Sequence, residues 1–282
     1  MRGARPRHPV GSLRSVDSPA VGARVHTAAV ATRVAALTVP DGGRTLSKTE
    51  ARARVWREME ICGVGRFPGA SGRIPNFVGA ERAALRLQGL RAWREARAVK
   101  INPDAPQLPV RRMALREGKV VYMAVPRLRN LECFLELDPA RLGKRALQAA
   151  SIRGAERFGV PVGIDDLPPI DLIVCGAVAV NARGARVGKG GGFSDLEYGL
   201  LVEAGRVGSR TPIVTTVHPV QILPESIEMR PHDLPVDVVV SPEGVMTLRP
   251  AFPRPAGLYR EALAPEKIAE VPVIERVLRQ GA

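Results

Sequence analysis

A short glycine-rich segment holds the residues of this chain best suited to chemistry. It reads Gly184-Ala-Arg-Val-Gly-Lys-Gly-Gly-Gly-Phe-Ser-Asp195, and a helical pattern follows it directly. Glycine lets backbone N–H groups approach a bulky anion because no Cβ stands in the way, and a helix N-terminus adds free N–H donors. With Arg186 and Lys189 supplying positive charge and Asp195 placed to hold a divalent metal, the segment predicts a polyphosphate site.

Two familiar nucleotide motifs do not describe this segment. A Walker A loop needs one more residue between Gly184 and Gly188-Lys189, and Gly190 stands where it needs a Ser or Thr for magnesium. A Rossmann fingerprint needs its first glycine at the end of a strand, whereas the apolar run here ends near Val180. The weight of the prediction therefore rests on the charged neighbours of the glycines.

The elements around the segment predict an α/β fold. Residues 170–180 are a near-continuous apolar run, typical of a buried parallel strand, and residues 195–204 have a helical pattern. Further strands are expected at 96–101, 120–125, 212–217, 236–240 and 245–248, and helices at 79–90 and 141–158. The alternation favours a three-layer sandwich with a mainly parallel sheet flanked by helices, of Rossmann-like topology.

The first expected helix starts at a capping box, Ser47-Lys-Thr-Glu50, and stops at Gly63. Lys48 and Arg52 are four residues apart and therefore share one face of this helix. Cations in a first turn oppose the helix dipole, which is a hint that the pair serves an anion.

Composition sets the remaining expectations. The chain has 282 residues and a formal charge of +14, nearly all of the excess being arginine, which favours anionic partners such as nucleotides. No apolar run is long enough to span a membrane. Cys62, Cys133 and Cys175 are scattered without zinc-site spacing, so a reducing cytoplasm is expected. We expect a basic N-terminal extension without fixed structure (1–46), one α/β domain (47–250) and a Pro-rich tail with a short helix (251–282).

The glycine segment resembles the signature of 5-formyltetrahydrofolate cyclo-ligases, also called methenyltetrahydrofolate synthetases. The matching residues are Gly184, Arg186 to Gly188, Gly190, Gly192, Phe193 and Asp195. Ser194 stands where the family has a second aromatic residue. The stretch that runs on to Asp195-Leu-Glu-Tyr198 is more similar to a divergent branch, the methenyltetrahydrofolate-synthetase-domain and plant cyclo-ligase-like proteins.

The resemblance implies a cyclo-ligase-like fold, ATP and Mg²⁺ as cofactors, and roles for named residues. Phosphates would be bound by Lys48 and Arg52, by Arg186 and Lys189 as the catalytic cations, and by the loop of Gly188, Gly190, Gly191, Gly192 and Phe193. Asp195 and Asp233 would hold Mg²⁺. Glu81, Phe193 and Ser194 would contact the substrate, a reduced folate or a related small molecule.

Three alternatives remain open from the sequence. The first is a cyclo-ligase that converts 5-formyltetrahydrofolate to 5,10-methenyltetrahydrofolate. The second is a related ATP-binding enzyme for another, thiamine-related substrate, favoured by Ser194 and by the absence of a Thr after Glu81. The third is an RNA-binding module, favoured by the charge but opposed by the lack of aromatic residues for base stacking. The sequence leaves the oligomeric state open.

Overall fold

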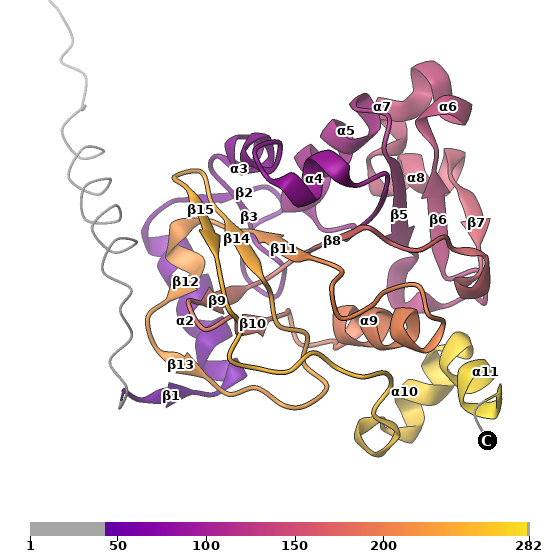
Figure 1. Cartoon of the computed structure of the whole chain (residues 1–282). Helices are drawn as coiled ribbons and strands as arrows, with labels where there is room; N and C mark the ends of the chain where they lie inside the picture. Colours follow the sequence, from indigo (N-terminus) through magenta and orange to yellow (C-terminus); the bar gives the residue numbers. More distant parts are fainter. Residues whose placement is uncertain (1–42, 281–282) are drawn as a thin grey trace, which may run out of the picture. The chain divides into compact units, whose positions relative to one another are not determined.

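A central sheet of eight strands organises the computed structural model, which describes residues 43–280 (Figure 1). In spatial order the strands are β15 (Val245–Thr247), β14 (Val238–Val240), β11 (Ile213–Thr216), β8 (Leu172–Cys175), β4 (Ala98–Ile101), β5 (Val120–Ala124), β6 (Phe134–Leu137) and β7 (Val160–Val162). The five strands from β14 to β5 are parallel, and β15, β6 and β7 run antiparallel to their neighbours. The mainly parallel α/β sheet predicted from the sequence is confirmed.

Helices cover both faces of this sheet, which gives three layers (Figure 1). One face carries α3 (Ala80–Leu87), α4 (Arg91–Glu95), α5 (Leu108–Arg116), α7 (Ala146–Ala149) and α8 (Ile152–Phe158). The other carries α9 (Phe193–Glu203), α10 (Pro265–Glu270) and α11 (Pro272–Gln280), and α6 (Pro139–Leu142) lies at the far edge. Short 3-10 turns join them at Ala105–Gln107, Pro126–Leu128, Gly143–Arg145, Ile164–Asp166, Pro219–Gln221 and Arg260–Ala262.

Two hydrophobic cores separate these layers, and the strands supply alternate residues to each. On β5, Val121 and Met123 belong to the core beneath α3 and α5, while Tyr122 and Ala124 belong to the core beneath α9. Since successive side chains of a strand point to opposite faces, a sheet buried on both sides needs apolar residues at nearly every position. This is why the strands read as apolar runs rather than as alternating patterns.

Helix α2 (Lys48–Ile61) lies beside a group of small sheets (Figure 1). The capping box predicted at its start is present: Glu50 N–H donates to Ser47 Oγ at 3.2 Å, and Ser47 N–H donates to Glu50 Oε2 at 2.9 Å. The small sheets pair β1 (Thr45–Leu46) with β13 (Ser226–Ile227), β2 (Gly65–Arg66) with β3 (Asn76–Phe77), and β9 (Ala179–Asn181) with both β10 (Arg186–Val187) and β12 (Ile222–Leu223). Within residues 43–280, regular structure therefore begins two residues before Ser47.

The strand expected over residues 170–180 is divided in two. β8 ends at Cys175, and the chain then leaves the main sheet to form β9. The break lies at Gly176, where a Cβ would stand 2.9 Å from both Asp104 Oδ2 and Ile74 Cγ2. The close approach of the loop after β4 therefore requires glycine here, and the turn carries the chain toward the glycine segment.

The helix expected over residues 141–158 is also interrupted. It consists of α6, a 3-10 turn, α7 and α8, and Ser151 caps α8 by accepting a hydrogen bond from Gly154 N–H at 3.0 Å. A Cβ on Gly154 would lie 1.8 Å from the Gln148 carbonyl oxygen, so the two short helices meet at a glycine. Strands β6 and β7, on either side of this region in the chain, had no clear sequence signal.

The boundary expected after residue 250 does not separate a tail from the domain. Val271, Val273 and Ile274 are fully buried and belong to the same core as α9. All of the described residues form one compact unit. The extension predicted for residues 1–46 lies outside the described residues except at its last four positions.

Candidate active site at the glycine loop

The glycine segment links β10 to the first turn of α9. Gly190 and Gly192 adopt positive φ angles of 111° and 69°, a region that disfavours any residue with a Cβ. Gly192 is the N-cap of α9 and offers no side chain to the first N–H groups of the helix. These N–H groups, with the positive end of an 11-residue helix behind them, are available to an anion.

A cavity of about 290 Å³ opens beside this segment, and we call it the loop cavity. Helix α2 supplies Lys48 and Arg52 to its wall, and the chain before β14 supplies Asp233. Arg52 Nε donates to the Gly188 carbonyl oxygen at 2.7 Å, which holds α2 against the loop. Burial lowers the pKa of Arg52, partly offset by the Asp233 and Asp195 carboxylates. A cation disfavoured by burial gains from the arrival of an anionic ligand.

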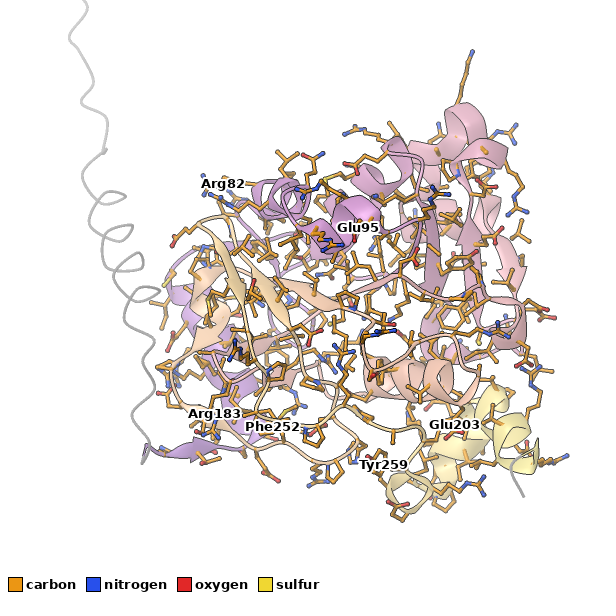
Figure 2. All side chains as sticks on the ribbon, viewed as in Figure 1. Arg82, Glu95, Arg183, Glu203, Phe252 and Tyr259 are labelled. Carbon is orange, nitrogen blue, oxygen red and sulfur yellow. The ribbon has the colours of Figure 1, made fainter. Side chains whose placement is uncertain are left out.

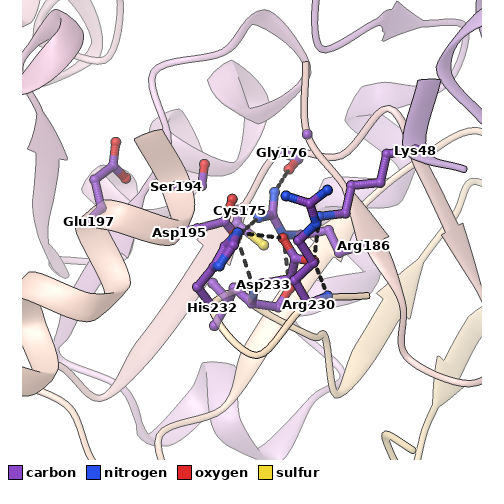
Figure 3. A network of polar contacts seen from close by, with 12 residues as sticks. Lys48, Cys175, Gly176, Arg186, Ser194, Asp195, Glu197, Arg230, His232 and Asp233 are labelled. Atoms are coloured by element: carbon purple, nitrogen blue, oxygen red, sulfur yellow. Dashed lines mark hydrogen bonds and ion pairs between the residues drawn. The ribbon is translucent and has the colours of Figure 1, made fainter. Parts of the chain in front are cut away.

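Arg186 lies beneath the loop and is 2% exposed (Figure 3). Its Nη2 donates to Asp195 Oδ1 at 2.5 Å, Nη1 to the Gly176 carbonyl oxygen at 3.2 Å, and Nε to the Leu234 carbonyl oxygen at 3.1 Å. Burial works against its charge, but Asp195, Cys175 and Asp233 together outweigh that cost, and the pKa of Arg186 is raised. With these donors engaged by the protein, Arg186 acts on the site by positioning Asp195.

Asp233 is the second carboxylate of the cavity and is 5% exposed. Its Oδ2 accepts from Arg230 N–H at 2.5 Å and pairs with Lys48 Nζ, and its Oδ1 lies 3.9 Å from His232 Nε2 (Figure 3). Lys48 therefore forms an ion pair with Asp233 across the cavity and does not extend only into solvent. An anion that enters here meets Lys48 already held in place.

The two carboxylates that line the loop cavity could hold a magnesium ion together with phosphates. Asp195 Oδ1 is engaged by Arg186 and by Leu234 N–H at 3.0 Å, and among the described residues its Oδ2 has no hydrogen-bond partner. Magnesium is commonly bound through one or two carboxylates together with substrate phosphates and water. Within residues 43–280, no three His, Cys, Asp or Glu side chains cluster as a metal site.

A larger cavity of about 900 Å³ lies on the opposite side of the glycine segment, and we call it the neighbouring cavity. Phe193 and Ser194 face it from the start of α9, and Ser194 Oγ accepts a hydrogen bond from Asn102 Nδ2 at 2.9 Å. Below them Lys100 forms an ion pair with Glu197, and its Nζ also donates to Asn102 Oδ1 at 2.5 Å. The floor of this cavity is therefore a connected polar network.

Gly191 borders both cavities. A third cavity of about 40 Å³ also touches Gly191. It is lined by Asp195, which lines the loop cavity as well, and by Ser194, which lines the neighbouring cavity as well. A Cβ on Gly191 would lie 3.0 Å from Phe193 Cδ2, so a side chain here would press on the aromatic ring. Groups bound in the two cavities would meet at this glycine.

A comparison with known protein families gives one match. The model of the 5-formyltetrahydrofolate cyclo-ligase family matches residues 49–242, well over half of the chain. The chain belongs to the 5-formyltetrahydrofolate cyclo-ligase family. The match takes in α2 from its second residue, the glycine loop, Asp195 and Asp233.

Relatives of this chain come from animals and plants. A methenyltetrahydrofolate synthase domain-containing protein of Mus musculus is 38% identical over 237 residues, covering 82% of this chain and 63% of the relative. The Homo sapiens protein of that name is 33% identical over 234 residues, covering 81% of this chain and 61% of the relative. The chain thus spans less than two thirds of these relatives. A solved 5,10-methenyltetrahydrofolate synthetase of Aquifex aeolicus is 22% identical with a TM-score of 0.45, covering 76% of this chain and 97% of that one.

The residues predicted to bind phosphate do not all lie on one side of the loop. Lys48, Arg52, Gly188, Gly190, Gly191 and Gly192 line the loop cavity together with Asp195 and Asp233. Lys189 instead lines the neighbouring cavity, where its Nζ lies 3.8 Å from Asp104 Oδ1. Arg186 lies in the short strand β10, whereas Lys189 follows at a bend of the loop, and both side chains border the small third cavity.

The structure does not bring Glu81 to either cavity. Ala80, Ala83, Ala84 and Leu87 form the buried face of α3, and Glu81 falls on its exposed face. The polar residues that do line the neighbouring cavity near β4 are Asn102 and Asp104. Because the C-terminal ends of parallel strands form the sites of α/β proteins, the sequence Lys100-Ile-Asn-Pro-Asp104 after an expected strand was the signal that could have identified them.

The described part of the chain adds two observations. No helix in it is both long and apolar enough to cross a bilayer. Cys133 and Cys175 are buried free thiols, and burial raises the pKa of Cys133 to about 12, so these thiols do not act as nucleophiles.

Proposed function

We propose that this protein is an ATP- and Mg²⁺-dependent ligase that converts 5-formyltetrahydrofolate to 5,10-methenyltetrahydrofolate. Family membership supports the reaction type. The observation that carries the proposal is the meeting of two cavities at Gly191, one lined by phosphate-binding groups and the other large enough for a pterin. A reaction that joins a nucleotide to a second substrate needs this arrangement.

This reaction requires that the two substrates be aligned and that the phosphate charge be neutralised, and it requires no protein nucleophile. A formamide carbon is a poor electrophile because its nitrogen donates electrons to the carbonyl group. Transfer of the γ-phosphoryl group to the formyl oxygen, with release of ADP, makes that oxygen a leaving group. The N10 amine then attacks the carbon and phosphate departs, which leaves the methenyl bridge. Such phosphoryl transfer is accelerated mainly by alignment and neutralisation of charge.

The loop cavity supplies both requirements. Lys48 and Arg52 would neutralise the terminal phosphates, and the N–H groups at the start of α9 would hold their oxygens. Asp195 and Asp233 would hold Mg²⁺, which supplies further charge stabilisation when bound. Arg186 keeps Asp195 in place from below. Phe193 lines the neighbouring cavity, where it would pack on the pterin.

The direct test is turnover of the purified full chain. With MgATP and 5-formyltetrahydrofolate we expect the absorbance of the methenyl product together with one ADP for each product formed. Lys48→Ala should raise the KM for ATP at least about tenfold, because a charge-assisted contact is worth roughly 1.5–3 kcal/mol. Arg57→Ala, a change on the same helix outside the cavity, is the matched control. No product from the wild-type protein at any ATP concentration would refute the proposal.

One observation favours a different substrate for the same phosphate site. The hydroxyl of Ser194 stands where the family carries an aromatic ring, and it is tied to Asn102 and through it to Lys100 and Glu197. This floor presents hydrogen-bonding groups in place of a flat apolar surface. ADP release with a thiamine-related or other formylated compound, but not with 5-formyltetrahydrofolate, would select this second candidate.

A further inference from the structure

The family match ends at residue 242, but the wall of the loop cavity does not. The side opposite the charged residues is formed by a later segment of the chain. Its lining residues include Leu258, Tyr259, Ala262, Leu263, Ala264 and Lys267. A segment outside the family domain therefore completes the cavity, and we call it the C-terminal wall (residues 257–267).

The C-terminal wall is held tightly against α9. Gly199 faces it from the middle of the helix, where a Cβ would stand 2.9 Å from the Gly257 carbonyl oxygen. A Cβ on Gly257 would in turn lie 2.4 Å from Glu203 Oε1, which accepts a hydrogen bond from Leu258 N–H at 2.9 Å. Figure 2 marks Glu203 and Tyr259 on these two elements. Two glycines and one hydrogen bond thus allow the backbones to touch.

The far end of the wall is anchored in the core. After α10, the residues Val271, Val273 and Ile274 are fully buried beneath the same face of the sheet as α9. Lys267 Nζ lies 4.3 Å from the centre of the Phe193 ring, which links the wall to the glycine loop. Fixed at both ends, the wall is a permanent side of the cavity.

Polarity divides the loop cavity into two halves. One half carries Lys48, Arg52 and Asp233 with the loop glycines, and the other carries Leu196 and the apolar side chains of the C-terminal wall. A ligand that fits both must have an anionic end and a flat apolar end. Tyr259 is the aromatic residue lining the apolar half, and its ring meets the His232 ring edge-on at a centroid distance of 6.3 Å.

We propose that the C-terminal wall is the base-binding surface of the nucleotide site, with Tyr259 stacking on the purine ring of ATP. The inference rests on the proposed function, because it assigns the opposite half of the cavity to the phosphates. Aromatic side chains stack on bases through their flat faces. The other ring that lines the cavity, His232, meets Tyr259 edge-on, which leaves the larger Tyr259 ring as the stacking surface of the apolar half. This contact would come from a segment beyond the family match.

The test separates base contacts from phosphate contacts. We would measure the binding of MgATP and of magnesium tripolyphosphate, which lacks a base, by calorimetry on the full chain. Tyr259→Ala should weaken ATP about 5- to 100-fold, the range expected for loss of one base-stacking ring, and leave tripolyphosphate unchanged. Tyr259→Phe, which keeps the ring, and Arg57→Ala, an exposed residue outside the cavity, should bind ATP as the wild type does. Lys48→Ala should weaken both ligands.

Three results would overturn the inference. If Tyr259→Ala binds ATP normally while Lys48→Ala does not, the base lies elsewhere and the phosphate site stands. If Tyr259→Ala weakens both ligands equally, Tyr259 supports the cavity without contacting the base. If the wild-type protein binds neither ligand, the proposed function fails and the inference with it. A thermal melt without ligand checks folding, and Tyr259→Leu replaces Tyr259→Ala if the latter does not fold.

Discussion

Replacing Arg186 with Met tests whether this residue supports the site from below. Methionine is of similar length but lacks the charge and the donors. The change leaves Asp195 without its buried partner and removes the donors that satisfy the Gly176 and Leu234 carbonyl groups at 3.2 and 3.1 Å. Removing one partner of a buried, hydrogen-bonded ion pair costs about 3–5 kcal/mol.

This loss should appear as a large fall in melting temperature. In a domain of this size each kcal/mol lowers Tm by about 2–4 °C, so Arg186→Met should melt about 6–20 °C below the wild type. The measurement is thermal unfolding followed by circular dichroism without ligand. Arg186→Lys, which keeps the charge but not the planar fork of donors, should lie between the two proteins.

Lys189→Met is the matched control. Lys189 is a cation of the same loop, but its side chain is 52% exposed and its Nζ lies 3.8 Å from the Asp104 carboxylate. An exposed pair of this kind contributes about 1 kcal/mol or less, so the control should melt within about 4 °C of the wild type. If Arg186→Met shifts Tm no further than Lys189→Met does, the buried network does not stabilise the loop and the positioning role is refuted.

Three further predictions follow from the geometry. Asp195→Asn keeps an oxygen for Leu234 N–H but loses the carboxylate charge, so the Mg²⁺ concentration for half-maximal activity should rise at least about tenfold, and an unaltered Mg²⁺ titration would contradict the ligand role. Asp104→Asn changes a residue that lines the neighbouring cavity and should raise the KM for the second substrate, whereas Glu81→Gln, on the exposed face of α3, should leave this KM unchanged. If steady-state kinetics show a raised KM for Glu81→Gln and an unchanged KM for Asp104→Asn, Glu81 belongs to the substrate site and Asp104 does not. Burial lowers the pKa of His218 to about 4. Between about pH 6.5 and pH 4 the unfolded state therefore binds a proton that the folded state does not, so the free energy of unfolding should decrease as the pH falls through this interval. In melts recorded at several pH values, a His218→Gln variant should lose less stability over this interval than the wild type. Identical pH profiles for the two proteins would refute the role given to His218.

The parts of the site that could be predicted are those encoded locally. The capping box at Ser47 and the glycines before Asp195 act through neighbouring backbone atoms, so their types and spacing suffice. The apolar runs likewise indicate a doubly covered sheet, because each buried strand must be apolar on both faces.

The parts that could not be predicted depend on contacts distant in the sequence. Glu81 matched a pattern but lies on the outer face of α3, whereas Asp104, without such a match, reaches Lys189. The break at Gly176 is imposed by the loop after β4, and Arg186 is held from below by residues far along the chain. The Pro-rich composition after residue 250 gave no indication that this segment completes a cavity.

Taken by itself, the sequence determined that this protein has a mainly parallel α/β sheet and a glycine-rich loop at the start of a helix. Both follow from short-range rules of backbone geometry and from the burial of apolar side chains. Only the tertiary structure decided which charged residues face one another, that Lys189 and Lys48 serve different cavities, and that residues 257–267 form the opposite wall. Those outcomes depend on how α2, α9 and the C-terminal helices pack around the sheet, and close packing joins side chains that no spacing along the chain relates.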